Sequence, residues 1–292
     1  TTQAITVNVT DVNDNSPVIT SSATFSAAEN QTAIGTVTTT DADGDTITYS
    51  ISGSDITINK IDNASAVIAF ASAPDYETKS SYTATVTASD GTNSTTQDIT
   101  VNVTDVNDNS PVFTVTETFS AAENQTAIGT VTATDADASD TVTFSVSGSE
   151  LAITSAGVLT FKTAPDYETK SQYTATVTAS DGTNTSTQSI TVNVTDVNEA
   201  PVFTSSATFS AAENQTAIGT VAASDVDGDT LTYSISGSDI TINSSSGVIA
   251  FASAPDYETK TSYTATVTAS DGTNSTTQAI TVNVTDVNDN SP

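Results

Sequence analysis

One block of residues recurs along this chain at nearly constant spacing. The string TVNVTDVN begins at Thr6, Thr100, Thr191 and Thr281, and its first aspartates, at positions 11, 105, 196 and 286, lie 94, 91 and 90 residues apart. The strings TAIGTV, PDYETK and ASDGTN each occur three times between these blocks, in the same order. A chain with this period is expected to fold as an array of similar units, each with its own core.

Apolar residues inside each unit recur at every second position, which predicts β-strands. Residues 82–88 alternate Tyr, Ala, Val and Ala with threonine, and residues 47–51 and 5–9 follow the same pattern. Asp-Gly pairs and the Asn-Asp-Asn run before Pro111 indicate turns. Six or seven short strands in about 90 residues are typical of a Greek-key sandwich. We therefore predict an all-β fold of tandem Greek-key, immunoglobulin-like β-sandwich repeats that form an elongated rod.

The phase of the repeat sets the expected domain boundaries. Residues 1–17 recur letter for letter as residues 276–292, so we assign residues 1–15 to the last strand and linker of a preceding repeat. Repeat 1 then covers residues 16–109, repeat 2 residues 110–200, and repeat 3, with its C-terminal linker, residues 201–292. This phase is the one expected for a segment of a longer tandem array.

Composition excludes several classes of function. The chain has no cysteine and no histidine, and its formal net charge is -30, from 5 basic and 35 acidic residues. Disulfide and zinc–thiolate chemistry are therefore excluded, and the commonest general base is missing. The charge repels nucleic acid and anionic membranes, and no apolar run approaches the roughly 18 residues that cross a bilayer. We expect neither nucleic-acid binding nor direct membrane insertion of this segment.

The acidic residues recur at the ends of the predicted strands, whereas charges that only confer solubility would be scattered. Each unit carries a Glu in the motif AEN, two acids in D-x-D, two in DYE and one in SDG, and the repeats are joined by DVNDN or DVNEA. The acids of the motifs are Glu29, Asp41, Asp43, Asp75, Glu77 and Asp90, then Glu123, Asp135, Asp137, Asp166, Glu168 and Asp181, then Glu213, Asp225, Asp227, Asp256, Glu258 and Asp271.

This order of motifs resembles that of the cadherin repeat, and the resemblance covers nearly the whole chain. It implies calcium ions between consecutive repeats, bound by the linker and by acids of both neighbours. At the first junction it implies the ligands Glu29, Asp75, Glu77, Asn107, Asp108, Asp135, Asp137 and Asp181, with the carbonyls of Val106 and Asn109. At the second it implies Glu123, Asp166, Glu168, Asn198, Glu199, Asp225, Asp227 and Asp271, with the carbonyls of Val197 and Ala200. It also implies half-sites at the outer linkers, the first with Asn13, Asn15, Asp41, Asp43 and Asp90 and the second within residues 286–290.

The residue types agree with calcium independently of the resemblance. Calcium binds six to eight oxygen atoms from carboxylates, amides and carbonyls. Without a cation these carboxylates repel one another, so we expect metal-free linkers to flex and filled linkers to lock two repeats end to end. In the second linker Glu199 replaces an Asp and Ala200 replaces an Asn. We expect the extra methylene of Glu199 to weaken calcium binding there, and the change at Ala200 to matter little, because the family uses that residue through its carbonyl.

Other interpretations of the acids are weaker. Asp and Asn also stabilise tight turns by hydrogen-bonding their own backbone, and Asp90 taken alone is explained in this way. An EF-hand loop needs a Glu at position 12 and two flanking helices, but the twelfth residue counted from Asp41 is Ser52. Glycosidase acids lie across a cleft, whereas Asp75 and Glu77 are two residues apart and recur in every unit.

We expect no enzymatic activity, but a calcium-rigidified extender segment of an extracellular adhesin that projects an adhesive tip from the cell surface. The cysteine-free repeats, rich in Ala, Ser, Thr and Asp, resemble most closely those of large bacterial biofilm adhesins. The expected partners are the neighbouring repeats of the same chain. The alternatives are direct homophilic adhesion to like molecules on adjacent cells and, less favoured, a carbohydrate-binding module.

Overall fold

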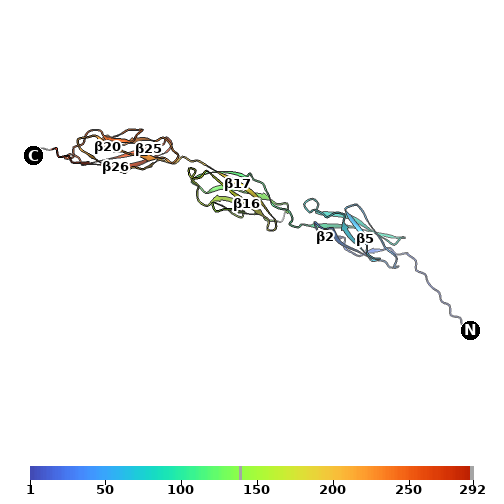
Figure 1. Cartoon of the computed structure of the whole chain (residues 1–292). Coiled ribbons are helices and arrows are strands. Elements are labelled where there is room, and N and C mark those ends of the chain that lie inside the picture. Colours follow the sequence, from blue (N-terminus) through green and yellow to red (C-terminus); the bar gives the residue numbers. More distant parts are fainter. Residues whose placement is uncertain (138–139, 290–292) are drawn as a thin grey trace.

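The computed structural model describes residues 1–137 and 140–289, and it shows three β-sandwiches that follow one another end to end (Figure 1). The two termini lie at opposite ends of this elongated chain. The predicted all-β rod of tandem sandwiches is therefore confirmed. Within the described residues, the structure shows no helical segment that could span a lipid bilayer.

Repeat 1 packs two four-stranded sheets against each other, one in the order β1-β3-β6-β5 and the other in the order β2-β8-β7-β4. Its strands are β1 (Val18–Ile19), β2 (Thr24–Ala28), β3 (Ala33–Thr40), β4 (Thr48–Ile51), β5 (Ile56–Lys60), β6 (Ser65–Phe70), β7 (Ser81–Ser89) and β8 (Ser94–Thr104).

The chain changes sheets between its first two strands. Strand β1 pairs with β3 in antiparallel orientation, whereas β2 pairs with β8 in parallel, with Thr24 opposite Thr100 and Ala28 opposite Thr104. All other pairs of repeat 1 are antiparallel. This order of strands is the predicted Greek key, and it places the last strand beside β2, at the end where the linker begins.

Repeats 2 and 3 have the same arrangement, except that the strand equivalent to β3 is divided in two. The strands of repeat 2 are β9 (Val112–Phe113), β10 (Thr118–Ala122), β11 (Ala127–Thr130), β12 (Ala133–Thr134), β13 (Thr143–Val146), β14 (Leu151–Ile153), β15 (Val158–Phe161), β16 (Gln172–Ser180) and β17 (Thr185–Thr195). Those of repeat 3 are β18 (Val202–Phe203), β19 (Thr208–Ala212), β20 (Ala217–Thr220), β21 (Ala223–Ser224), β22 (Thr232–Ile235), β23 (Ile240–Ile242), β24 (Val248–Phe251), β25 (Ser262–Ser270) and β26 (Ser275–Thr285).

Each repeat has its own core, built from alternate residues of the facing strands. In repeat 1, Val86 of β7 and Val101 of β8 are fully buried opposite Ile68 of β6. The rings of Phe70 and Tyr82 pack edge to face, with centroids 5.0 Å apart. The other two repeats repeat this pattern. A core of this kind allows a unit of about 90 residues to fold without disulfides.

The hairpin between β5 and β6 is longer in repeat 1, which has three more residues there than repeat 3. The extra length lets Val37 and Thr38 pair with β6, so that β3 continues unbroken to Thr40. In repeat 3 a tight turn ends the hairpin instead. The carbonyl of Gly247, which has a φ of 70°, accepts a hydrogen bond from the N–H of Val221 at 2.9 Å. The insertion thus extends the sheet rather than only enlarging a surface loop.

Residues 1–10 form no strand, although their sequence predicts one. The same letters at residues 276–285 lie within β26, which pairs with β25 on one side and with β19 on the other. Ile5, Val7 and Val9 are 79–93 % exposed. A strand of this kind is stabilised by two neighbours in its own sandwich, and the described residues provide neither neighbour for the first ten. The assignment of residues 1–15 to a preceding repeat stays a prediction, and residues 290–292 lie outside the described chain.

Two glycines of repeat 2 allow a matched test of the tight turn between β14 and β15. A Cβ at Gly157 would lie 2.1 Å from the carbonyl oxygen of Val131, whereas a Cβ at Gly148 would meet nothing within 4 Å, and both residues have positive φ. We expect Gly148→Ala to lower the free energy of unfolding by about 1–2 kcal/mol through backbone strain alone. Gly157→Ala should lower it by about 3 kcal/mol or more because it adds a clash with backbone. Urea denaturation of repeat 2 measures both, and equal losses would contradict the described turn.

Candidate metal centres

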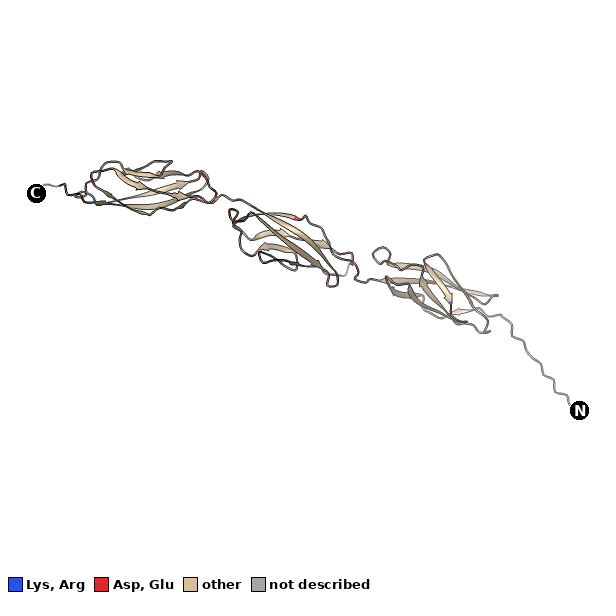
Figure 2. Ribbon diagram, viewed as in Figure 1, with Lys and Arg blue, Asp and Glu red and all other residues tan. Residues whose placement is uncertain are grey.

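The acids of the separate motifs lie in the loops and linkers at the ends of the sandwiches (Figure 2). Strand β8 ends at Thr104 and β9 begins at Val112, so the first linker lies between them. The second linker lies between Thr195, at the end of β17, and Val202, at the start of β18. The linkers pair with no strand of the described chain, and side chains of both adjoining repeats bind their backbone instead.

The glutamate of each AEN motif fastens the linker to the upstream repeat. Glu29 is 3 % exposed, and its carboxylate accepts hydrogen bonds from the N–H of Val106 at 2.8 Å and of Tyr76 at 2.7 Å. Glu123 and Glu213 bind the equivalent pairs, Val197 with Tyr167 and Val287 with Tyr257. Each of these carboxylates thus accepts hydrogen bonds from two backbone N–H groups, one in the linker and one in the DYE motif. These predicted ligands therefore have a structural role that needs no metal.

The next residue, an asparagine, binds the acid of the linker. Asn30, Asn124 and Asn214 have φ between 60° and 64°, a left-handed conformation that asparagine adopts more readily than most residues. The amide of Asn30 donates to the carboxylate of Asp108, and the amide of Asn124 donates to that of Glu199. The carboxylate of Glu199 therefore binds the asparagine equivalent to the one that binds Asp108, and the weaker calcium binding expected at the second junction stays a prediction.

The D-x-D motif of the downstream repeat presents carboxylate oxygens to the linker. The first Asp accepts a hydrogen bond from the N–H of the second through one oxygen, at 3.1 Å in both Asp135 and Asp225. Its other oxygen is buried and has no partner within residues 1–137 and 140–289. The second Asp binds the linker directly, because Asp137 accepts hydrogen bonds from the backbone and side-chain N–H groups of Asn109, both at 2.9 Å.

The aspartate of SDG both stabilises a turn and keeps an oxygen free. Oδ1 of Asp181 accepts hydrogen bonds from the N–H groups of Thr183 and Asn184, each at 2.6 Å. This is the turn chemistry that the sequence allowed. Oδ2 of Asp181, like that of Asp90, is buried without a partner in the described chain. At the second junction, Oδ2 of Asp271 accepts a hydrogen bond from Asn198 at 2.9 Å. The turn and ligand interpretations of these acids are therefore compatible.

Carboxylates from both sides of the first junction approach one another. Glu77 of the upstream repeat, Asp105 of the linker and Asp137 of the downstream repeat each place an oxygen within 4.8 Å of the others. A second group of this kind joins Glu29, Glu77 and Asp108. The second junction has the matching groups Glu168, Asp196 and Asp227, and Glu123, Glu168 and Glu199.

Sequence reasoning left Asp105 and Asp196 out of the predicted ligand set, although the structure places both in these groups. The sequence contained a signal for them, because each is the first acid of a recurring DVN string.

Asp75 lies differently from its neighbour Glu77: its carboxylate accepts hydrogen bonds from Thr78, at 3.2 Å from the N–H and at 2.9 Å from the hydroxyl. These bonds lower the pKa of Asp75, and Asp166 makes the same contacts with Thr169.

Burial, together with the crowding of like charges, raises several pKa values at the junctions. Burial, followed by the charges of Asp137 and Glu29, raises the pKa of Asp105. Burial also raises the pKa of Glu77 and of Glu199. A raised pKa means that the surroundings disfavour the ionised carboxylate. A divalent cation between these groups would favour it, and the all-oxygen donor set with its unpaired buried oxygens fits Ca²⁺.

The two junctions differ because the second linker, DVNEAP, is one residue shorter than the first, DVNDNSP. Counted from the downstream repeat, Glu199 takes the place of Asn109, because its N–H donates to Oδ2 of Asp227 at 2.8 Å as that of Asn109 does to Oδ2 of Asp137 at 2.9 Å. The side-chain amide of Asn109 also donates to Oδ1 of Asp137 at 2.9 Å, whereas Oδ1 of Asp227 is buried without a partner among the described residues. The shorter linker therefore changes the hydrogen bonding of a candidate ligand, and the small effect expected of Ala200 on calcium binding stays a prediction.

The aspartate that follows D-x-D lies near the linker as well. Asp41, Asp43 and Asp45 place oxygen atoms within 4.8 Å of one another. In repeat 2, Asp140 accepts a hydrogen bond from the amide of Asn107 at 2.7 Å. Residues 138 and 139 of that loop lie outside the described residues. The carbonyls of Val106 and Val197 stay predicted ligands.

Glu123 allows its structural role to be separated from metal binding. We expect Glu123→Ala to leave the N–H groups of Tyr167 and Val197 without their acceptor and to lower the free energy of unfolding of repeat 2 by about 1–3 kcal/mol. Denaturation in excess EDTA measures this loss, and the exposed Glu117→Ala serves as the control. A loss seen only in the presence of calcium would contradict the metal-independent role.

A family model described as Cadherin domain matches residues 22–104, 117–195 and 207–285. Among curated proteins, the chain is 35 % identical to the cadherin EGF LAG seven-pass G-type receptor 2 of Mus musculus over 99 % of the chain and 11 % of that protein. It is 33 % identical to the protocadherin-like wing polarity protein stan of Drosophila melanogaster over 100 % of the chain and 9 % of that protein. The chain thus spans about a tenth of the length of these relatives.

Solved structures show the same fold. The chain is similar to mouse cadherin-23 EC22-24, with a TM-score of 0.60 and 24 % identity over 94 % of this chain and 100 % of that one. It is also similar to protocadherin gammaB7 EC3-6, with a TM-score of 0.63 and 23 % identity over 95 % of this chain and 79 % of that one. With three matched domains that together cover most of its length, the chain belongs to the cadherin domain family.

Proposed function

We propose that this chain is a calcium-stiffened segment of an extracellular, cell-surface adhesion protein, in which it holds an adhesive tip away from the cell. The observation that carries the proposal is the convergence of Glu77, Asp105 and Asp137 from an upstream repeat, a linker and a downstream repeat. A calcium ion there would supply the positive charge that three ionised carboxylates lack. Because its ligands would belong to two sandwiches, bending the junction would require breaking coordination.

The remaining ligands would come from the groups described above. At the first junction, Glu29, Asp135 and Asp181 lie beside the linker that contains Asp108, and at the second junction Glu123, Asp225 and Asp271 lie beside the linker that contains Glu199. Asp75, Asp166, Asn107 and Asn198 would join them through oxygen lone pairs that their present hydrogen bonds leave available.

Membership of the cadherin family supports an extracellular, cell-adhesive role without enzymatic activity. The shape of the chain supports extension, since each repeat contains a strand of 11 residues in its sheet. At about 3.4 Å per residue, such a strand is about 37 Å long. The relatives reported above are animal proteins, so the resemblance to bacterial biofilm adhesins stays a prediction from composition.

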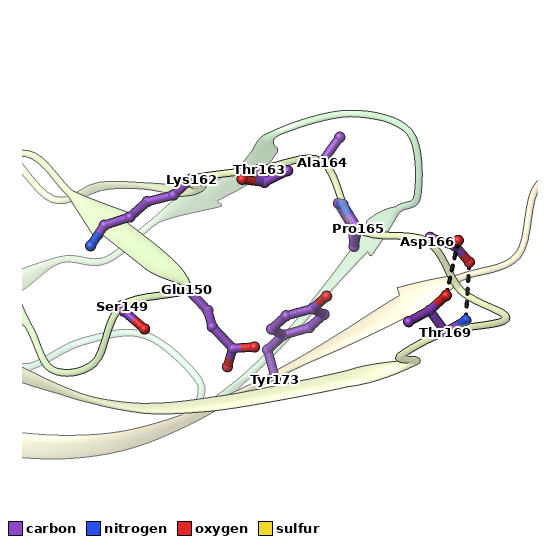
Figure 3. A pocket seen from close by; sticks show the side chains of 9 residues that line it. All are labelled: Ser149, Glu150, Lys162, Thr163, Ala164, Pro165, Asp166, Thr169 and Tyr173. Atoms are coloured by element: carbon purple, nitrogen blue, oxygen red, sulfur yellow. Dashed lines mark hydrogen bonds between the residues drawn. The ribbon is translucent and has the colours of Figure 1, made fainter.

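The carbohydrate-binding alternative receives little support from the side of the sandwich. A pocket of about 390 Å³ in repeat 2 is lined by Glu150, Lys162 and Tyr173 among others (Figure 3). The Nζ atom of Lys170 lies 4.3 Å from the centre of the Tyr173 ring and 2.5 Å from Oε1 of Glu150. The aromatic ring and the acid that a sugar would use are thus already bound by a side chain of the same repeat.

Removal of calcium tests the proposal directly. We expect small-angle scattering in millimolar calcium to show an extended particle, and excess EDTA to shorten its maximum dimension. The melting temperature should fall as well, because a ligand at 100 times its Kd stabilises the folded state by about 2.7 kcal/mol. Magnesium, which prefers a smaller octahedral site, serves as the control cation. Identical scattering curves with calcium and with EDTA would refute the stiffening role.

Asp105 tests the site itself. Asp105→Asn removes one charge from the three-acid group while it keeps the size of the side chain, so we expect the calcium affinity of the first junction to fall at least about tenfold, the typical cost of a lost charged hydrogen bond or ligand. Asp98→Asn makes the same change on the exposed face of β8 and should leave the affinity unchanged. Isothermal titration with calcium measures both, and equal affinities would exclude Asp105 from the site.

A further inference from the structure

The last asparagine of each ASDGTN motif is held rigidly by the turn in which it lies. In repeat 2, the N–H of Asn184 donates to Asp181, and the carbonyl of Asn184 accepts a hydrogen bond from the hydroxyl of Ser180 at 3.2 Å. Gly182, with a φ of 103°, provides the left-handed residue that this turn needs. The backbone of Asn184 is thereby fixed, and its side chain reaches the linker.

The side-chain amide of this asparagine binds the linker at both junctions. Nδ2 of Asn184 donates to Oδ1 of Asn107 and to the carbonyl oxygen of Asn109, each at 2.8 Å. Nδ2 of Asn274 donates to the carbonyl oxygen of Asn198, also at 2.8 Å. These bonds join neutral groups of the linker to the downstream repeat, and none of them involves a carboxylate.

The N-terminal end of the chain shows the same contact without an upstream sandwich in the described residues. Nδ2 of Asn93 lies 3.2 Å from Oδ1 of Asn13 and 3.2 Å from the carbonyl oxygen of Asn15. The backbone and side chain of Asn15 also donate to Asp43, at 2.8 Å each. The linker therefore binds the repeat that follows it at a place where the described residues contain no upstream sandwich.

We propose that Asn184 and Asn274 are positioning residues, which fasten each linker to its downstream repeat without a metal ion. An amide suits this role because it satisfies linker oxygens without adding charge. A lysine there would compete with a cation for the carboxylates, and an aspartate would add to their repulsion. These contacts act in the metal-free state and are therefore distinct from stiffening by calcium. The linker and the downstream repeat are then already ordered relative to each other before an ion binds, which lowers the entropic cost of ion binding.

Two substitutions at Asn184 separate hydrogen bonding from shape. Asn184→Asp keeps the size of the side chain but removes the donor, and Asn184→Ser removes the amide without adding charge. Thr183→Asp places the same charge on the exposed neighbouring residue of the loop and serves as the control. Each protein is produced as the full three-repeat chain in a host that does not glycosylate the Asn184-Thr185-Ser186 sequence.

The readout is hydrogen exchange of the Asn109 backbone amide, measured by NMR in excess EDTA. We expect both Asn184 variants to speed this exchange at least tenfold relative to the parent and to Thr183→Asp, while the melting temperature of repeat 2 stays unchanged. Exchange as slow as in the parent would overturn the proposal. Faster exchange accompanied by unfolding of repeat 2 would also overturn it, since the asparagine would then only support the turn. The measurement uses no calcium, so its outcome is independent of whether calcium stiffens the rod.

Discussion

The repulsion between carboxylates that two separately folded sandwiches bring to one linker is the main constraint on each junction of this rod. Glu77, Asp105 and Asp137 belong to three different parts of the chain, yet the architecture forces their oxygens close together. The packing of neither core requires these carboxylate oxygens to lie close together. Their proximity follows from the strand order, which ends one sandwich with β8 and begins the next within a few residues. Charges of this kind are stable side by side only when hydrogen bonds or a cation compensate them.

The chain compensates part of this charge itself. Glu29 receives hydrogen bonds from two backbone N–H groups, and Asp137 receives one from the backbone N–H and one from the side-chain amide of Asn109, so some of the acids are bound within the protein. Others keep a buried oxygen without a partner among the described residues, as Asp135 and Asp181 do. The junction therefore combines acids that shape the protein with acids that remain available for a cation. The presence of an acidic residue in a motif does not by itself show whether its carboxylate shapes the protein or is available for a cation.

The fold was readable from the sequence because the alternation of apolar residues and the turn signals recur in every unit. Residues 5–9 were the exception, since their pattern is that of a strand but the strand needs neighbours that the described residues lack. The set of acids at the junction was largely predictable, because repetition marked it. The contacts of Asn184 were not, because a hydrogen bond from its side-chain amide to a linker residue 75 positions away depends on how a turn and a linker meet in space.

The parallel pairing of β10 with β17 has a mechanical consequence. Strand β10 lies near the N-terminal entry of its repeat and β17 leads out of it, and five consecutive residue pairs join them from Thr118 to Ala122. A force that pulls the two ends of the rod apart slides these strands along each other, so it loads all of their hydrogen bonds together instead of opening them one after another. Each sandwich thus resists tension in shear, the geometry in which a small sheet withstands the largest load.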